Sequence, residues 1–172
     1  MADFLKAFPV ISENEGGYCE IKGDKGGETY CGISRVNNPR CDIWGIIDSK
    51  PHPIKWNTIF EDLKDYVISF YKKYEWDTIC GDLISSQAVA TYVFDWHVNS
   101  GGAVKQTQKL IGAFPDGVFG EKSVELLNSK DWLNEIHKLR CAYYKSLNQP
   151  QFEKEWLARA NKTYNICINQ IS

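Results

Sequence analysis

Glu13-Asn14-Glu15-Gly16-Gly17-Tyr18, with the glycine-rich run at residues 23–34 (Gly-Asp-Lys-Gly-Gly-Glu-Thr-Tyr-Cys-Gly-Ile-Ser), is the stretch that decides the fold of this 172-residue chain. Before it, apolar side chains at positions 4–11 recur at helical spacing, although Pro9 should kink or restart the helix. The glycines interleaved with polar residues predict a turn-rich hairpin. The sequence therefore predicts a helix that ends at Glu15 and enters a small β-hairpin.

The rest of the chain reads as mostly helical. Residues 36–57 predict an irregular excursion, and Thr58-x-x-Glu61 resembles a capping box that opens a helix. The apolar stripe expected for that helix consists of Phe60, Leu63, Val67, Phe70 and Tyr74. Further helices are expected at about 85–99, 103–111, 121–128 and 132–147, with a last helix after Pro150. The predicted fold class is mainly α, with a small N-terminal β-hairpin insert.

Composition excludes several classes of protein. The net charge of −2 and the pI near 5.9 argue against a nucleic-acid or anionic-membrane partner. No apolar run approaches the roughly 18 residues that a membrane span needs, and the N-terminus lacks the features of a signal peptide. Six cysteines without C-x-x-C pairs and three histidines without ligand spacing predict reduced thiols, no metal and no cofactor.

Glu15 is the first candidate for chemistry. A carboxyl group at a helix end, just before two glycines, can be half buried while it faces a cleft, and partial desolvation favours the neutral acid that a proton donor needs. Asp24 follows nine residues later and Thr29 five after that. Glu15 on the helix end and Asp24 on the hairpin could lie on opposite sides of a sugar bond. From spacing alone the alternative stays open that Glu15 caps the helix and Asp24 makes a turn.

Three blocks in order resemble the glycoside hydrolase family 108 N-acetylmuramidases, which include secretion activators and phage endolysins. The first block is Glu15-Gly16-Gly17-Tyr18 with Asp24, Gly26-Gly27, Thr29 and Gly32-Ile33-Ser34; the second is Tyr74-x-Trp76-Asp77 with Phe94-Asp95-x-x-Val98-Asn99-Ser100-Gly101; the third is Gln108-x-Leu110-Ile111-Gly112 with Asp116-Gly117-Val118-Phe119-Gly120. The third resembles the peptidoglycan-binding segment that ends family members. The resemblance implies a lysozyme-like α+β fold whose hairpin flanks the active-site cleft.

The resemblance also implies roles for single residues. Glu15 would be the catalytic acid, and Asp24 and Thr29 would complete a Glu–Asp–Thr arrangement, although that pattern usually has one more residue between the last two. Asp95 and Asn99 share a helix face and either bind sugar groups or fasten the helix to the hairpin. With Tyr18 they complete the predicted substrate-binding set. His97 is expected to be a packed or surface histidine.

The cysteines and the domain organisation complete these expectations. Cys19, Cys31 and Cys41 depart from the family pattern near the candidate site, and a disulfide between the first two across the hairpin stays open. We expect a single domain over residues 1–172, with a catalytic part at 1–100. The helical part at 101–172, which carries the peptidoglycan-binding-like segment, is expected to pack in that same domain.

The leading hypothesis is hydrolysis of the β-1,4 bond between N-acetylmuramic acid and N-acetylglucosamine. A lytic transglycosylase, a non-catalytic wall-binding secretion accessory protein and a Cys/His amidase are the alternatives. The expected partner is the peptidoglycan glycan strand, with a holin or secretion system for export, and the chain is expected to be a monomer. It would stay cytoplasmic until released to the wall. Inverting and retaining stereochemistry are both compatible with the sequence.

Overall fold

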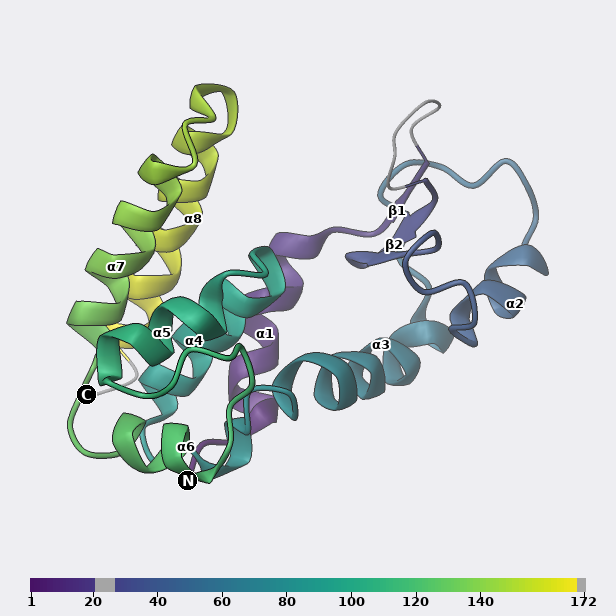
Figure 1. The fold of residues 1–172 in the computed structure, drawn as a ribbon. Helices are drawn as coiled ribbons and strands as arrows, with labels where there is room; N and C mark the ends of the chain where they lie inside the picture. Colours follow the sequence, from purple (N-terminus) through teal and green to yellow (C-terminus); the bar gives the residue numbers. More distant parts are fainter. Residues whose placement is uncertain (21–26, 170–172) are drawn as a thin grey trace. The chain divides into compact units, whose positions relative to one another are not determined.

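The computed structural model describes residues 1–20 and 27–169 (Figure 1). Within them the chain is mainly helical with a small antiparallel sheet, as expected. In chain order the elements are α1 (Phe4–Glu15), β1 (Tyr18–Cys19), β2 (Thr29–Tyr30), β3 (Ile33–Ser34), α2 (Ile43–Asp48), η1 (Glu61–Leu63), α3 (Lys64–Tyr71), η2 (Lys72–Trp76), η3 (Gly81–Leu83), α4 (Gln87–Asn99), α5 (Ala103–Ile111), α6 (Glu121–Leu127), α7 (Leu133–Ser146) and α8 (Pro150–Asn169).

The chain forms two compact units. Residues 11–71 make the sheet-bearing unit, and residues 1–10 with 72–172 make the helical unit. The helices after residue 101 therefore share a unit with α4 and do not form a separate module. A single domain over residues 1–172 stays a prediction.

Helix α1 runs without interruption from Phe4 to Glu15, so Pro9 does not restart it. The apolar side chains of Ala7, Val10 and Ile11 are buried on both sides of the proline. Their packing compensates for the backbone hydrogen bond that proline cannot donate. The helix ends at Glu15, as the sequence predicts.

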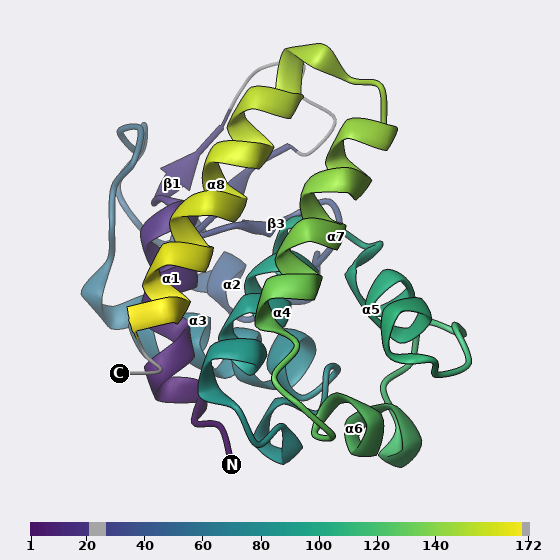
Figure 2. The same cartoon turned by 90° about the vertical axis from the view of Figure 1, so that its left-hand side faces the viewer.

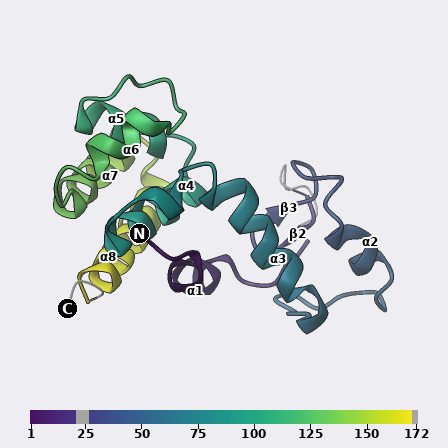
Figure 3. The ribbon, with the colours of Figure 1, turned by 90° about the horizontal axis from the view of Figure 1, so that it is seen from below.

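The sheet has the order β1-β2-β3 and is antiparallel throughout. Strands β2 and β3 are labelled in Figure 3. Tyr18 lies opposite Tyr30, which in turn lies opposite Ile33. All three are buried and form the apolar face of the sheet. A two-residue turn, Cys31-Gly32, joins β2 to β3, with φ values of 46° and 78°. Positive φ at both positions is typical of the type I′ turn that suits a tight hairpin.

The segment between the sheet and α3 departs from the expected pattern in two places. It contains the short helix α2, which buries Ile43, Trp44 and Ile47 at helical spacing. The predicted capping box is wrong, because the helical region begins only at Glu61 and the Thr58 hydroxyl donates instead to the Lys55 carbonyl at 2.7 Å. The backbone of Thr58 is paired with Tyr18, which keeps it out of the helix.

The stripe predicted for α3 is correct at Leu63 and Val67, which are buried, and wrong at Tyr74, which is 53% exposed. The reason is a π-helical turn, η2, that follows α3. A π-turn holds more residues than an α-turn, so it rotates the buried face onward along the chain. Trp76 therefore takes the buried position instead of Tyr74.

Helix α4 is the centre of the helical unit. Every residue from Ala88 to Trp96 is buried, which is typical of a helix surrounded by protein on all sides. Ser86 caps its N-terminus by accepting a hydrogen bond from the Val89 amide at 3.3 Å. Helices α7 and α8 lie side by side as a hairpin (Figure 2) and pack against α4, as does α5. Pro150 begins α8, a position where its missing N–H costs nothing.

Among the helices of the described residues, none combines the length and the apolar character needed to cross a bilayer. The same part of the chain holds no group of three or more His, Cys, Asp or Glu side chains able to bind a metal ion. All six cysteines lie within it as free thiols. Cys19 is opposite Thr29 in the sheet, not opposite Cys31.

Candidate functional site

Glu15 is the last residue of α1 and is half-buried. The next residue, Gly16, has a φ of 64°, a left-handed conformation that ends the helix and suits glycine. Gly17 is buried against the backbone of the segment at residues 57–58: a Cβ on it would lie 2.5 Å from the Thr58 carbonyl oxygen. The two glycines thus turn the chain sharply and bring it into direct backbone contact with that segment.

The carboxyl group of Glu15 faces the turn between β2 and β3. A Cβ on Gly32 would lie 2.6 Å from Glu15 Oε2 and closer still to the hydroxyl oxygen of Tyr71. Tyr71 is buried at the end of α3, and its hydroxyl donates to the Cys31 carbonyl at 2.8 Å. The turn, the end of α1 and the end of α3 therefore meet at the carboxyl group.

Cys31 precedes Gly32 in the turn that faces this carboxyl group. Burial raises the pKa of the Cys31 thiol, and the negative charge of Glu15 raises it further. The thiol is therefore protonated near neutral pH, and it makes a poor nucleophile. Glu15 is the carboxyl group of this cluster, and a carboxyl group is a side chain that can serve as a general acid.

Of the other two predicted catalytic residues, the structure describes only Thr29. Asp24 lies outside the described residues. Thr29 is half-buried on β2, two residues before Cys31, and its hydroxyl is 3.5 Å from the Gly27 carbonyl oxygen. Thr29 thus belongs to the same hairpin as the turn that faces Glu15. Its catalytic role stays a prediction, as does that of Asp24.

Tyr18 is only 4% exposed. Its hydroxyl donates to Glu20 Oε2 at 3.3 Å, and burial together with the nearby Glu28 and Glu20 carboxylates raises its pKa. The ring forms part of the apolar face of the sheet, so little of this side chain is open to a sugar. Substrate binding by Tyr18 stays a prediction.

An ion cluster that no sequence pattern predicted lies beside the sheet. Arg35 binds Asp48 through both guanidinium Nη atoms, at 2.7 and 2.6 Å, and Glu28 at 2.6 Å. The Arg35 guanidinium holds the pKa of Asp48 below its usual range. The cluster ties β2 and β3 to α2. Arg35 directly follows the Gly-Ile-Ser motif, but its partners are brought together only by the folded chain.

Asp95 is fully buried in the helical unit and is enclosed by basic side chains. Arg140 Nη1 lies 2.8 Å from Asp95 Oδ2 as an ion pair without hydrogen-bond alignment, and Arg159 donates to Asp95 Oδ1 from Nε at 3.0 Å. Thr163 donates to Oδ2 at 3.1 Å. The cluster joins α4 to α7 and α8, so a sugar could reach Asp95 only if these helices opened.

Asn99 belongs to the same region. Its Oδ1 accepts a hydrogen bond from the Tyr144 hydroxyl at 2.6 Å, and Tyr144 in turn accepts from Arg140 Nε at 2.9 Å. Asn99 as a whole is half-buried. The contacts that the structure gives these two residues join α4 to α7 and α8. Sugar binding by either residue stays a prediction.

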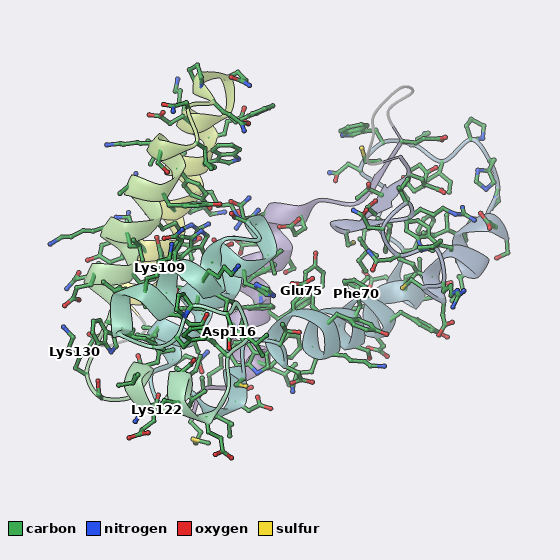
Figure 4. All side chains as sticks on the ribbon, in the orientation of Figure 1. Phe70, Glu75, Lys109, Asp116, Lys122 and Lys130 are labelled. Atoms are coloured by element: carbon green, nitrogen blue, oxygen red, sulfur yellow. The ribbon has the colours of Figure 1, made fainter. Side chains whose placement is uncertain are left out.

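Two of the three histidines, His97 and His137, are packed into the helical unit, whereas His52 is exposed in the sheet-bearing unit. His97 Nε2 lies 3.4 Å from the carboxylate of Glu75, which is labelled in Figure 4. Burial lowers the pKa of His97. His137 Nδ1 is 2.8 Å from the Tyr92 hydroxyl and 3.9 Å from Cys141 Sγ. Burial raises the pKa of Cys141, so this Cys/His pair lacks the thiolate that an amidase nucleophile needs.

The third sequence block spans the end of α5 and the loop between α5 and α6, and the loop includes Asp116 (labelled in Figure 4). The buried side chain of Gln108 donates to Asp116 Oδ1 at 2.8 Å and to the Val118 carbonyl at 2.9 Å, and accepts from the Gly117 amide at 2.9 Å. These bonds fold the loop back onto α5. The block is thus part of the helical unit.

Comparisons with known proteins agree with this architecture. A family model described as glycosyl hydrolase 108 matches residues 8–101. Among solved structures, "Structure of Brucella abortus SagA" superposes with a TM-score of 0.72 and 27% sequence identity, covering 96% of this chain and 94% of that chain. No curated protein sequence matches. All six predicted site residues lie within the region matched by the family model, and the third sequence block lies beyond it.

Proposed function

Because the chain belongs to glycosyl hydrolase family 108, we propose that it hydrolyses the β-1,4 bond between N-acetylmuramic acid and N-acetylglucosamine, with Glu15 as the general acid. Membership itself supports the coarser statement that the chain is a glycoside hydrolase acting on peptidoglycan. The particular bond and the role of Glu15 are the proposal. Its main support is the placement of the Glu15 carboxyl group against Gly32, beside Tyr71.

The proposed reaction begins with proton transfer from Glu15 to the glycosidic oxygen. The bond between the anomeric carbon and this oxygen breaks, and a water molecule adds to the anomeric carbon. We propose that Asp24 either orients this water or stabilises the oxocarbenium-like transition state, and that Thr29 is a further catalytic residue. The products are a reducing N-acetylmuramic acid end and a free 4-hydroxyl on N-acetylglucosamine.

Digestion of purified peptidoglycan by the wild-type protein and by Glu15→Gln, followed by mass analysis of the muropeptides, tests the proposal. Glutamine keeps the shape of the side chain but cannot donate the proton, so we expect a loss of at least about a hundredfold in kcat. Glu13→Gln is the matched control, because Glu13 is exposed on the same helix. A wild-type protein inert on several wall types, or an active Glu15→Gln, would contradict the proposal.

The mass of the products separates the two catalytic mechanisms. A hydrolase leaves a product one water heavier than the anhydro sugar of a lytic transglycosylase. A transglycosylase needs no second carboxylate, so Asp24→Asn should reduce activity strongly under our proposal and leave it intact under the alternative. A non-catalytic wall-binding protein would bind sacculi without releasing muropeptides, and its binding would survive Glu15→Gln.

We extend the proposal to the protein's setting. The glycan strand of peptidoglycan is the proposed partner, and a holin or secretion system would release the chain from the cytoplasm to the wall. The proposed state is a monomer, which sedimentation of the purified protein tests directly.

A further inference from the structure

The segment at residues 55–58 lies along the free edge of β1. The Tyr18 amide donates to the Thr58 carbonyl at 2.9 Å, and the Asn57 amide donates to the Tyr18 carbonyl at 2.7 Å. A third bond, from the Thr58 amide to the Lys55 carbonyl at 3.2 Å, closes the segment into a turn. The backbone of Asn57 is thereby held beside the residues that follow the catalytic acid.

The backbone of Asn57 contacts Tyr18, and its side chain contacts the preceding residue, Gly17. Its Oδ1 accepts the Gly17 amide hydrogen at 2.7 Å. On the other side, the Gly17 carbonyl accepts from the Cys31 amide at 3.3 Å. Gly17 is therefore held from two directions, by a side chain before α3 and by the turn between β2 and β3.

Asparagine is suited to this position for two separate reasons. The φ of Asn57 is 60°, in the left-handed region that asparagine visits more readily than most residues. Its amide oxygen supplies the acceptor for Gly17. Alanine would lack both properties, and glycine would keep only the first.

These contacts link Glu15 to the β2–β3 turn. Gly17, two residues after Glu15, is hydrogen-bonded to Cys31, and the next residue of the turn, Gly32, lies against the Glu15 carboxyl group. Asn57 fixes Gly17 by accepting the hydrogen bond from its amide. From this geometry we propose that Asn57 is a positioning residue, which sets where the Glu15 carboxyl group stands relative to the β2–β3 turn. The inference rests on the proposed function of Glu15.

Asn57→Gly removes the acceptor and keeps the backbone conformation, so it tests this role directly. We expect kcat on peptidoglycan to fall between about tenfold and a hundredfold, because a small displacement of a catalytic group is costly. KM should stay within about twofold, since the substitution removes no proposed substrate contact. Asn57→Asp restores the acceptor and should recover most of the lost kcat.

Asn148→Gly is the matched control. Asn148 also has a positive φ, 50°, but lies between α7 and α8 in the helical unit. This variant should keep the wild-type kcat. The positioning role is overturned if Asn57→Gly loses no more kcat than Asn148→Gly, or if Asn57→Asp is as impaired as Asn57→Gly.

A second readout makes the test independent of activity. In Asn57→Gly the Gly17 amide should exchange its hydrogen faster, and the side-chain carboxyl carbon of Glu15 should shift its NMR resonance. If the wild-type protein releases no muropeptides, the proposed function fails while these signals still report on the positioning contact. An unchanged Glu15 resonance in Asn57→Gly overturns the positioning role.

Discussion

Gly32→Ala adds a single methyl group at the point where the β2–β3 turn faces the carboxyl group of Glu15. The new carbon would lie 2.6 Å from Glu15 Oε2 and 3.2 Å from the carboxyl carbon, whereas ordinary van der Waals contact begins at 3.4 Å. The carboxyl oxygen must therefore retreat by about 0.8 Å, or the turn must move by a similar distance. Tyr71 blocks relief in its own direction, because its hydroxyl oxygen would also be in collision with the methyl group.

The substitution also has a backbone cost that must be separated from this collision. Gly32 has a φ of 78°, and an L-residue with a side chain loses about 1–2 kcal/mol in that region. Gly112 has the same φ of 78°, and a Cβ there would meet nothing within 4 Å. Gly112→Ala therefore carries the backbone cost alone and is a matched control.

The assay compares both variants in muropeptide release and in thermal unfolding. We expect both to lower Tm by roughly 2–8 °C, from about 2–4 °C per kcal/mol for a chain of this size. Only Gly32→Ala should lose kcat, by about tenfold to a hundredfold, because only there is the acid displaced. If Gly32→Ala keeps the kcat of Gly112→Ala, the carboxyl group does not depend on the turn, and the reasoning about the site is refuted.

Three further predictions concern the rest of the chain. Asp95→Ala should reduce the free energy of unfolding by about 3–5 kcal/mol in urea titrations, because it leaves the buried guanidinium of Arg140 without its counter-charge; a loss below about 1 kcal/mol would contradict this. Burial lowers the pKa of His97 below its ordinary 6.5, so the unfolded chain binds the proton more readily, and stability should fall as the pH drops below about 6.5; His97→Gln should flatten that fall in urea midpoints measured across this range. Alkylation of thiols should lower muropeptide release because Cys31 lies in the turn that faces Glu15, while Cys31→Gly, which tolerates the φ of 46°, should stay active after treatment; equal inactivation of both proteins would implicate another thiol.

The alkylation prediction bears on the alternative of a Cys/His amidase. Loss of activity after alkylation would at first sight favour a catalytic thiol. The structure offers a different cause, because a bulky group on Cys31 would disturb the β2–β3 turn, whose Gly32 faces the Glu15 carboxyl group. The Cys31→Gly variant distinguishes the two explanations, which the treatment of the wild-type protein alone cannot do.

Much of the fold follows from local pattern. The apolar spacing before Glu15 and the glycines after it predict where α1 ends, and helical periodicity predicts α4 to α7 closely. The capping box at Thr58 failed because a backbone hydrogen bond with Tyr18, forty residues away in sequence, competes for that residue. The exposure of Tyr74 was missed because η2 changes the helical period, which no local pattern showed.

The sequence by itself determined the candidate acid, the glycines around it and the family blocks, because these depend on residue type and order along the chain. Only the tertiary structure decided what surrounds Glu15: Gly32 and Tyr71 come from elements far apart in sequence, and their proximity to the acid is a property of packing. It likewise enclosed Asp95 with Arg140 and Arg159, since a buried carboxylate needs counter-charges that only distant helices could bring. The sequence thus proposed the acid, and only folding brought Gly32, Tyr71 and the Asn57 contact together around it.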